Sequence, residues 1–308
     1  MRPLRIAIVG FGKIAADQHV PAIAGHPRLE LVATVSRSDA GPAPSFHDID
    51  ALLASGIGLD AVAITTPPSV RYEIARKCID AGLHALLEKP PTVTLGEIED
   101  LACLADGKQV TMFTTWHAQE NPAVAAAGEA LAGQRIATMD ILWHEDVRKW
   151  HPGQQWIWEA GGFGVFDPGI NAFSIITRIF PGQLFVSEAD LSFPEGADTP
   201  IAGDIVFHSP MADGPLRCSL DWRKEEGEEW TITIRTASGR EVRITDGGSR
   251  LFLDGTETPT EGPGEYPALY GRFVDLIDER RSQVDVAPLR MVADTLLVAR
   301  RHSVAAAP

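Results

Sequence analysis

Hydrophobic and polar residues follow different rhythms in the two parts of this chain. Up to about residue 118, short apolar runs typical of strands buried on both faces alternate with amphipathic stretches typical of helices. This alternation predicts a doubly wound parallel sheet of the Rossmann type. The predicted strands are 4–9, 29–35, 60–65, 83–87 and 109–113. One predicted helix ends near residue 25, and two others span 69–81 and 94–107.

Beyond residue 118, longer strand patterns follow one another. Short turn signals separate several of them, which predicts hairpins in series and a mostly antiparallel sheet. We therefore predict two α/β domains, at residues 1–118 and 119–308. In the second, strands are predicted at 136–145, 183–191, 204–208, 216–222, 230–236 and 241–245, and helices at 122–131, 172–179, 267–281 and 288–299.

Composition narrows the class of protein. The 308 residues include 42 acidic and 27 basic side chains, a net charge of −15, which argues against a nucleic-acid or anionic-membrane partner. No apolar run could span a bilayer, and the first predicted strand leaves no room for a signal peptide, so we expect a cytoplasmic protein. The three cysteines and nine histidines lack metal-ligand spacing, and we expect no metal site.

A glycine fingerprint lies between the first predicted strand and its helix. The segment from Gly10 to Ala15 reads G-x-G-x-x-A and contains Gly12, Lys13 and Ile14. The first glycine allows a tight turn, and the second lets the backbone approach a pyrophosphate at the helix N-terminus. In this position the fingerprint predicts a dinucleotide site.

The end of the second predicted strand bears on the choice of dinucleotide. An NAD site usually carries an acidic residue there, but this chain has Ser36 and Arg37, with no acid before Asp39. A hydroxyl and a guanidinium suit the 2′-phosphate of NADP. An ordinary polar turn is the alternative, so we expect NADP and NAD both to be candidates.

Lys89 follows the strand at 83–87, in the sequence Glu88-Lys89-Pro90-Pro91. The carboxyl edge of a parallel sheet is where ligands bind, and a partly buried lysine can accept a proton. A surface lysine that ends a strand is the alternative. Another predicted strand ends at the same edge in the turn that contains Thr66 and Pro67.

The second part of the chain supplies aromatic and polar candidates. Five of the seven tryptophans lie between residues 116 and 158, and the segment 150–158 is too broken for one regular element. Aromatic faces with a few polar groups suit a sugar, although core packing is the alternative. Asp167 and Asn171 are four residues apart and can share one helix face, unless Asp167 is only an N-cap.

Together these motifs resemble the Gfo/Idh/MocA oxidoreductases. Four motifs occur in the same order as in that family: the glycine fingerprint, the turn at 66–68, and the segments 88–90 and 161–171. The resemblance covers essentially the whole chain. The resemblance implies a Rossmann domain that binds the dinucleotide, then a substrate-binding and oligomerisation domain with a large open sheet, and a homo-oligomer. It departs at Asn171, where the family usually has histidine, which puts an inositol substrate in doubt.

Segments 145–148, 150–158 and 266–270 are similar to the family's bacterial 1-dehydrogenases of L-arabinose and D-galactose. That similarity implies oxidation of C1 of L-arabinose, D-galactose or D-fucose to the aldonolactone. Oxidation of a secondary alcohol on another sugar or cyclitol, and a nucleotide-sensing regulator, remain alternatives. The residues implied are catalytic Lys89 and Asp167, substrate-binding His117, Glu145, Trp150, His151, Trp156 and Asn171, and cofactor-binding Gly10, Gly12, Lys13, Ile14, Ser36, Arg37, Thr66, Pro67, Glu88 and Lys89.

Overall fold

The computed structural model describes residues 2–37 and 41–307. Two compact units divide the chain: Met1–His117 with Pro263–Val286, and Ala118–Gly262 with Ala287–Pro308. Within the described ranges, no helix is long and apolar enough to cross a membrane.

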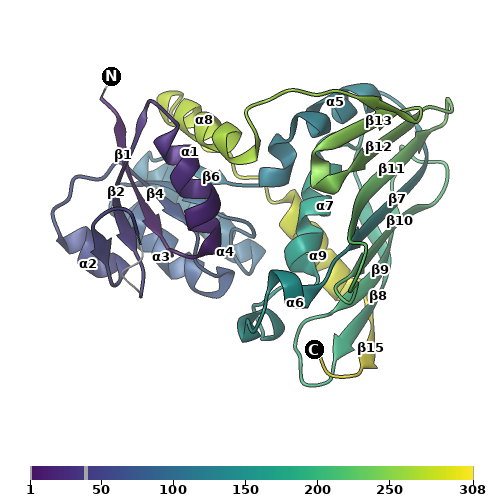
Figure 1. The fold of residues 1–308 in the computed structure, drawn as a ribbon, viewed down its shortest axis with the longest axis horizontal. Helices are drawn as coiled ribbons and strands as arrows, with labels where there is room; N and C mark the ends of the chain where they lie inside the picture. The colour runs from purple at the N-terminus through teal and green to yellow at the C-terminus, as the bar shows by residue number, and fades with distance from the viewer. Residues whose placement is uncertain (1, 38–40, 308) are drawn as a thin grey trace. The chain divides into compact units, whose positions relative to one another are not determined.

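The first unit is built on a six-stranded parallel sheet with the order β3-β2-β1-β4-β5-β6 (Figure 1). Its central strands are apolar and buried on both faces, as the sequence pattern predicted. The strands are β1 (Leu4–Val9), β2 (Leu29–Val35), β3 (Ser45–Phe46), β4 (Ala61–Ile64), β5 (His84–Leu87) and β6 (Met112–Thr114).

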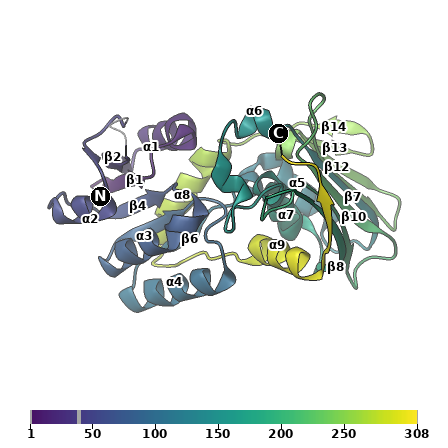
Figure 2. The ribbon, with the colours of Figure 1, turned by 90° about the horizontal axis from the view of Figure 1, so that it is seen from below.

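Helices cover this sheet, and α3 and α4 pack side by side against it (Figure 2). Local sequence sets their ends: Thr94 and Glu97 form a reciprocal capping box at the start of α4. The helical elements are η1 (Ala15–His19, with π geometry), α1 (Val20–Ala24), α2 (Ile49–Ala54), α3 (Pro68–Asp80), α4 (Leu95–Lys108), η2 (His117–Glu120), which runs on into the second unit, and α8 (Glu265–Asp278).

Helix α8 belongs to the first unit although it lies far along the chain. Leu269, Phe273 and Leu276 on its apolar face are each at most 1% exposed. They share one buried cluster with Ile8 of β1 and Phe113 of β6. The sequence placed this helix in the second domain, because periodicity shows that a helix has an apolar face but not which sheet covers it.

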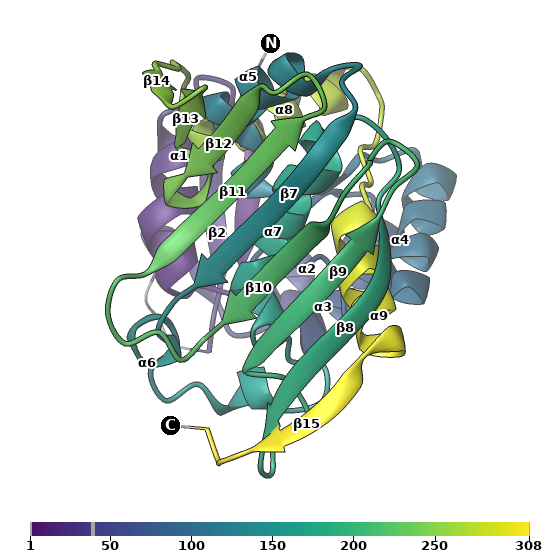
Figure 3. The same cartoon turned by 90° about the vertical axis from the view of Figure 1, so that its right-hand side faces the viewer.

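The second unit is built on a nine-stranded sheet with the order β14-β13-β12-β11-β7-β10-β9-β8-β15 (Figure 3). Most neighbours are antiparallel, and the pairs β7–β10 and β8–β15 are parallel. The strands are β7 (Ile136–His144), β8 (Phe185–Pro194), β9 (Ala202–His208), β10 (Leu216–Asp221), β11 (Glu229–Thr236), β12 (Glu241–Thr245), β13 (Arg250–Leu253), β14 (Thr256–Thr258) and β15 (Arg300–Val304).

Helices α5, α7 and α9 lie on one face of this sheet (Figure 3). Helix α7 approaches β10 closely because Gly169 has no side chain: a Cβ there would lie 2.7 Å from Leu220 Cδ1. The helical elements are α5 (Pro122–Leu131), α6 (Val147–Trp150), η3 (Gln155–Trp158), α7 (Phe166–Ile179), η4 (Asp246–Gly248) and α9 (Ala287–Val298).

One of the predicted hairpins does not form. The strands β10 and β11 follow each other in the chain but are not neighbours, because β7 lies between them and pairs with both. Helix α7 begins at Phe166, so Asp167 lies inside its first turn, and the alternative in which it is only an N-cap is excluded.

Candidate active site

The glycine fingerprint forms a cradle with the geometry that a dinucleotide requires. Gly10 has φ +98°, and a Cβ there would lie 2.7 Å from the backbone nitrogen of Thr66. A Cβ on Gly12 would meet nothing within 4 Å, so its backbone borders open space. Lys13 and Ile14 are exposed beside it. This shape fits a pyrophosphate at the loop before the helix.

The turn after β4 lies against the cradle. The buried Thr66 hydroxyl has no hydrogen-bond partner among the described residues, and a buried polar atom of this kind calls for a donor or acceptor from outside the chain. Pro67 is exposed and precedes the first turn of α3. Both positions therefore suit a bound cofactor.

At the end of β2, Arg37 is exposed and Ser36 is half-buried. The backbone N–H of Ser36 donates to Phe46 O at 2.9 Å. This backbone bond fixes where β2 ends. Asp39, the first acidic residue after this strand, lies outside the described residues.

Glu88 and Lys89 follow β5, and their environments differ. Lys89 is half-buried, and its peptide bond to Pro90 is cis. Glu88 is 4% exposed. Burial by itself raises the pKa of this carboxyl group, but hydrogen bonding to His19, the charges of His19 and His117, and the Tyr266 hydroxyl outweigh it and bring the pKa to about 2.

His117 follows β6 and is held by α8. Its Nδ1 lies 2.9 Å from Glu265 Oε2, and its ring stacks on Tyr266 with centroids 5.6 Å apart. Burial and the charge of Lys89 lower the pKa of His117. The hydrogen bond and charge of Glu265 and the charge of Glu88 raise it by more, so the pKa of His117 lies above its ordinary value. His117 therefore carries its proton more readily than a free imidazole does.

In the second unit, Glu145 follows β7 and binds two indoles. Its Oε1 accepts from Trp222 Nε1 at 2.8 Å and its Oε2 accepts from Trp230 Nε1 at 2.9 Å. The side chain is 6% exposed. Glu145 therefore fixes two aromatic walls, and its role as a direct sugar ligand stays a prediction.

His151 and Asp167 are brought together by α6 and α7. His151 Nε2 lies 3.2 Å from Asp167 Oδ2, and Nδ1 lies 3.2 Å from Gln154 Oε1. The same amide oxygen accepts from Trp156 Nε1 at 3.0 Å. Both ring nitrogens thus face oxygen atoms, which fixes the orientation of the imidazole.

Asn171 lies one helical turn after Asp167 on α7, as the spacing predicted. Trp150 is 46% exposed and donates through Nε1 to Glu228 at 2.5 Å. Trp150 thus binds a residue outside the segment 150–158, whereas Trp156 binds Gln154 within it.

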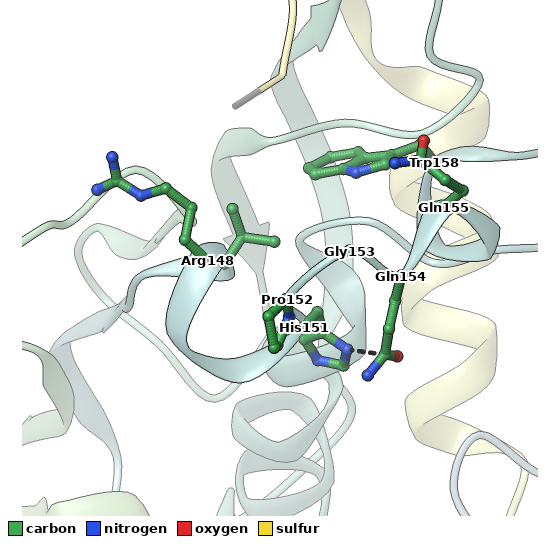
Figure 4. A pocket seen from close by; sticks show the side chains of 8 residues that line it. Arg148, His151, Pro152, Gly153, Gln154, Gln155 and Trp158 are labelled. Atoms are coloured by element: carbon green, nitrogen blue, oxygen red, sulfur yellow. Dashed lines mark hydrogen bonds between the residues drawn. The ribbon is translucent and has the colours of Figure 1, made fainter.

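A cavity of about 240 Å³ opens beside His151 (Figure 4). Ligand pockets usually exceed about 300 Å³. In Figure 4, Arg148 extends away from His151 and Gln154. The lining residues are Val147, Arg148, His151, Pro152, Gly153, Gln154, Gln155 and Trp158. Among the predicted sugar-binding residues only His151 lines this cavity, so the cavity by itself does not define the sugar site.

Sequence reasoning did not single out Gln154, Trp222 and Trp230 of these clusters. It also missed Arg71 of α3, a buried guanidinium that donates to the carbonyl oxygens of Glu88 and Pro90. Trp222 and Trp230 are the two tryptophans outside the cluster at 116–158, and only the total of seven tryptophans drew attention to them. Nothing in the sequence around Arg71 distinguishes it from a surface arginine on an amphipathic helix. The catalytic roles of Lys89 and Asp167 stay predictions.

Comparison with known proteins identifies the family of this chain. Residues 4–115 match the family model described as "Oxidoreductase family, NAD-binding Rossmann fold", GFO_IDH_MocA. Along its whole length the chain is 42% identical to a galactose 1-dehydrogenase of Pseudomonas fluorescens, over 99% of both proteins. The chain belongs to the Gfo/Idh/MocA oxidoreductase family. The predicted resemblance and fold class are therefore confirmed.

Solved structures of this family share the fold. The D-galactose-1-dehydrogenase protein from Rhizobium etli superimposes with a TM-score of 0.93 at 46% identity, over 100% of this chain and 99% of that one. KijD10, a 3-ketoreductase from Actinomadura kijaniata, has a TM-score of 0.81 at 17% identity, over 98% and 100% of the two chains, and shows the common fold alone. This chain is an oxidoreductase with an NAD-binding Rossmann fold.

Proposed function

We propose that this protein is an aldose 1-dehydrogenase that oxidises C1 of cyclic D-galactose, L-arabinose or D-fucose to the aldonolactone. The observation that carries the proposal is the 42% identity with a galactose 1-dehydrogenase across 99% of both chains. The first unit binds NAD(P)+ through the Gly10–Gly12 cradle, and the second unit binds the sugar.

The chemistry requires one proton and one hydride to leave the sugar. The cofactor, which the Gly10–Gly12 cradle would hold, would supply the acceptor for the hydride from C1. Lys89, at the carboxyl edge of the parallel sheet, takes the proton of the C1 hydroxyl, and the C1–O bond becomes the lactone carbonyl. Asp167 orients the sugar together with His151, to which it is already bound.

Sugar recognition comes from the second unit. His151, Asp167 and Asn171 hydrogen-bond the ring hydroxyls, and Trp156 supplies an apolar wall next to His151, with ring centroids 6.3 Å apart. Glu145, Trp150 and the first unit's His117 complete the proposed set. A cytoplasmic location and a homo-oligomer stay predictions.

A panel of sugars tests the function. D-Galactose, L-arabinose and D-fucose share configuration at C2 to C4, so all three should reduce NAD(P)+. D-Glucose is inverted at C4, and it leaves polar groups of the site unpaired, so its kcat/KM should be at least about 100-fold lower. Nicotinamide absorbance gives the rates, and hydroxamate trapping identifies a lactone. A ketone product, or glucose turned over as fast as galactose, would contradict the proposal.

We further propose that NADP+ is accepted along with NAD+. Replacing Arg37 with Asp removes the guanidinium and adds a carboxylate at the end of β2, so the KM for NADP+ should rise while the KM for NAD+ changes little. The control is Arg240→Asp, which makes the same charge change on an exposed side chain of the second unit. Exclusive use of NAD+ by the wild type, with no effect of Arg37→Asp, would refute this choice of cofactor.

A further inference from the structure

Two tyrosines of the 266–270 motif have no place in the proposed reaction. Tyr266 and Tyr270 lie four residues apart on α8, so both side chains fall on one face of the helix. They are 4% and 0% exposed. A buried tyrosine hydroxyl needs a partner, and each of these has one in the first unit.

Both hydroxyls lead to the residue that precedes Lys89. Tyr266 OH donates to Glu88 Oε1 at 2.7 Å, and Tyr270 OH lies 2.7 Å from His19 Nδ1. His19 Nε2 lies 3.3 Å from the same Glu88 oxygen, and in either protonation state of this imidazole an N–H can donate there. Helix α8 thus contacts Glu88 directly and through His19.

The other oxygen of Glu88 holds the backbone of Lys89. Lys89 N–H donates to Glu88 Oε2 at 2.5 Å. Both carboxylate oxygens therefore accept hydrogen bonds from the protein itself. This favours a role for Glu88 inside the unit over direct contact with a cofactor.

The Lys89 turn is also held from the side of α3. The guanidinium of Arg71 is buried and donates to the carbonyl oxygens of Glu88 and Pro90, the residues on either side of Lys89. It also donates to Thr66 O, at the cofactor-facing turn. The backbone of Lys89 is thus fixed by a carboxylate on its N–H and by a guanidinium on the neighbouring carbonyls.

We propose that Glu88 and Tyr266 are positioning residues that hold Lys89 in place for proton transfer. Tyr266 fixes the carboxylate of Glu88, and the carboxylate fixes the backbone of Lys89. This inference rests on the proposed function, in which Lys89 accepts the proton of the C1 hydroxyl.

The position of Glu88 gives the inference a measurable consequence. Glu88→Gln replaces one of the two accepting oxygens with an NH2 group, so the hydrogen bonds from Lys89 N–H and Tyr266 OH cannot both be kept as they are. The titratable and charged groups around the Glu88 carboxylate are His19 on η1, Lys89 after β5, His117 after β6, Tyr266 and Tyr270 on α8, and Arg71 of α3 on the backbone side.

The experiment uses Glu88→Gln and Tyr266→Phe in the full chain. Tyr266→Phe keeps the ring that stacks on His117 and removes only the hydroxyl. The control Tyr72→Phe removes a hydroxyl that binds Asp100 at the exposed side of α3. Three measurements are made: kcat and KM with galactose, the Kd for NADP+ by fluorescence titration, and the rate of Lys89 acetylation at a fixed pH, read by mass spectrometry.

We expect Tyr266→Phe to lower kcat about tenfold, the effect of losing one hydrogen bond to a charged group, while the Kd for NADP+ stays nearly unchanged. Glu88→Gln should lower kcat at least as far and change the rate of Lys89 acetylation. Tyr72→Phe should match the wild type in all three.

The inference is overturned if Glu88→Gln leaves the rate of Lys89 acetylation as it is in the wild type, or if Tyr266→Phe loses cofactor affinity in step with kcat. If Glu88→Gln does not fold, the split between kcat and Kd in Tyr266→Phe decides. Acetylation needs no turnover, so a changed rate in a protein that oxidises no aldose would support the positioning role and refute the proposed function.

Discussion

Replacing Lys89 with alanine is expected to lower the turnover number for sugar oxidation by a factor of about 10² to 10⁴, the usual contribution of a general base. The C1 hydroxyl must lose its proton as the hydride leaves, and Lys89 is the proposed acceptor. The Lys89 N–H bond to Glu88 comes from the backbone and survives the substitution, so the turn itself should keep its shape. The affinity for NAD(P)+ should therefore stay nearly unchanged.

Steady-state kinetics and a cofactor titration measure the two effects separately. Lys108→Ala is the matched control, because that lysine is exposed at the end of α4 and pairs with Asp80. Near-normal turnover of Lys89→Ala would remove its assigned role and make Asp167 the leading candidate for the base.

Two glycines of the fingerprint should respond differently to the same substitution. Gly10→Ala places a Cβ 2.7 Å from Thr66 N at φ +98°, where L-residues are strained. We expect it to lower the free energy of unfolding by at least about 2 kcal/mol, through strain and overpacking. Dinucleotide affinity should fall with it, because β1, the fingerprint loop and the Thr66 turn must move apart.

Gly12→Ala should leave folding intact, since its Cβ would meet nothing within 4 Å. It should instead weaken NAD(P)+ binding by roughly tenfold or more, about 1.4 kcal/mol, because the methyl group occupies space that the pyrophosphate needs. Thermal unfolding without ligand and a cofactor titration distinguish the two variants. Equal loss of stability in both, or unchanged affinity in Gly12→Ala, would contradict the proposed cradle.

Much of the fold followed from local pattern. Strands β1 and β2 and helix α5 occupy the residues that their apolar patterns predicted, because a strand buried on both faces and a helix with one apolar face leave distinct sequence periods. Asp167 and Asn171 likewise share one face of α7 because four residues make about one helical turn. These features depend on neighbours in sequence, so the sequence by itself determined them.

Pairing between distant segments was decided only by the tertiary structure. The insertion of β7 between β10 and β11 replaces the predicted hairpin, because strand periodicity carries no information about which strand lies alongside. Helix α8 joins the first unit because its apolar face is buried with β1 and β6, a choice that its own sequence does not encode.

The residues around Lys89 show the same division. The sequence determined that a lysine follows a buried strand at the ligand-binding edge of a parallel sheet. That Arg71 is buried and binds the carbonyls beside Lys89 depends on how α3 packs on β5. That Tyr266 donates to Glu88 across 178 residues depends on the docking of α8. Local sequence patterns fix each element's own shape and exposed chemistry, whereas contacts between elements arise only when their buried faces pack together.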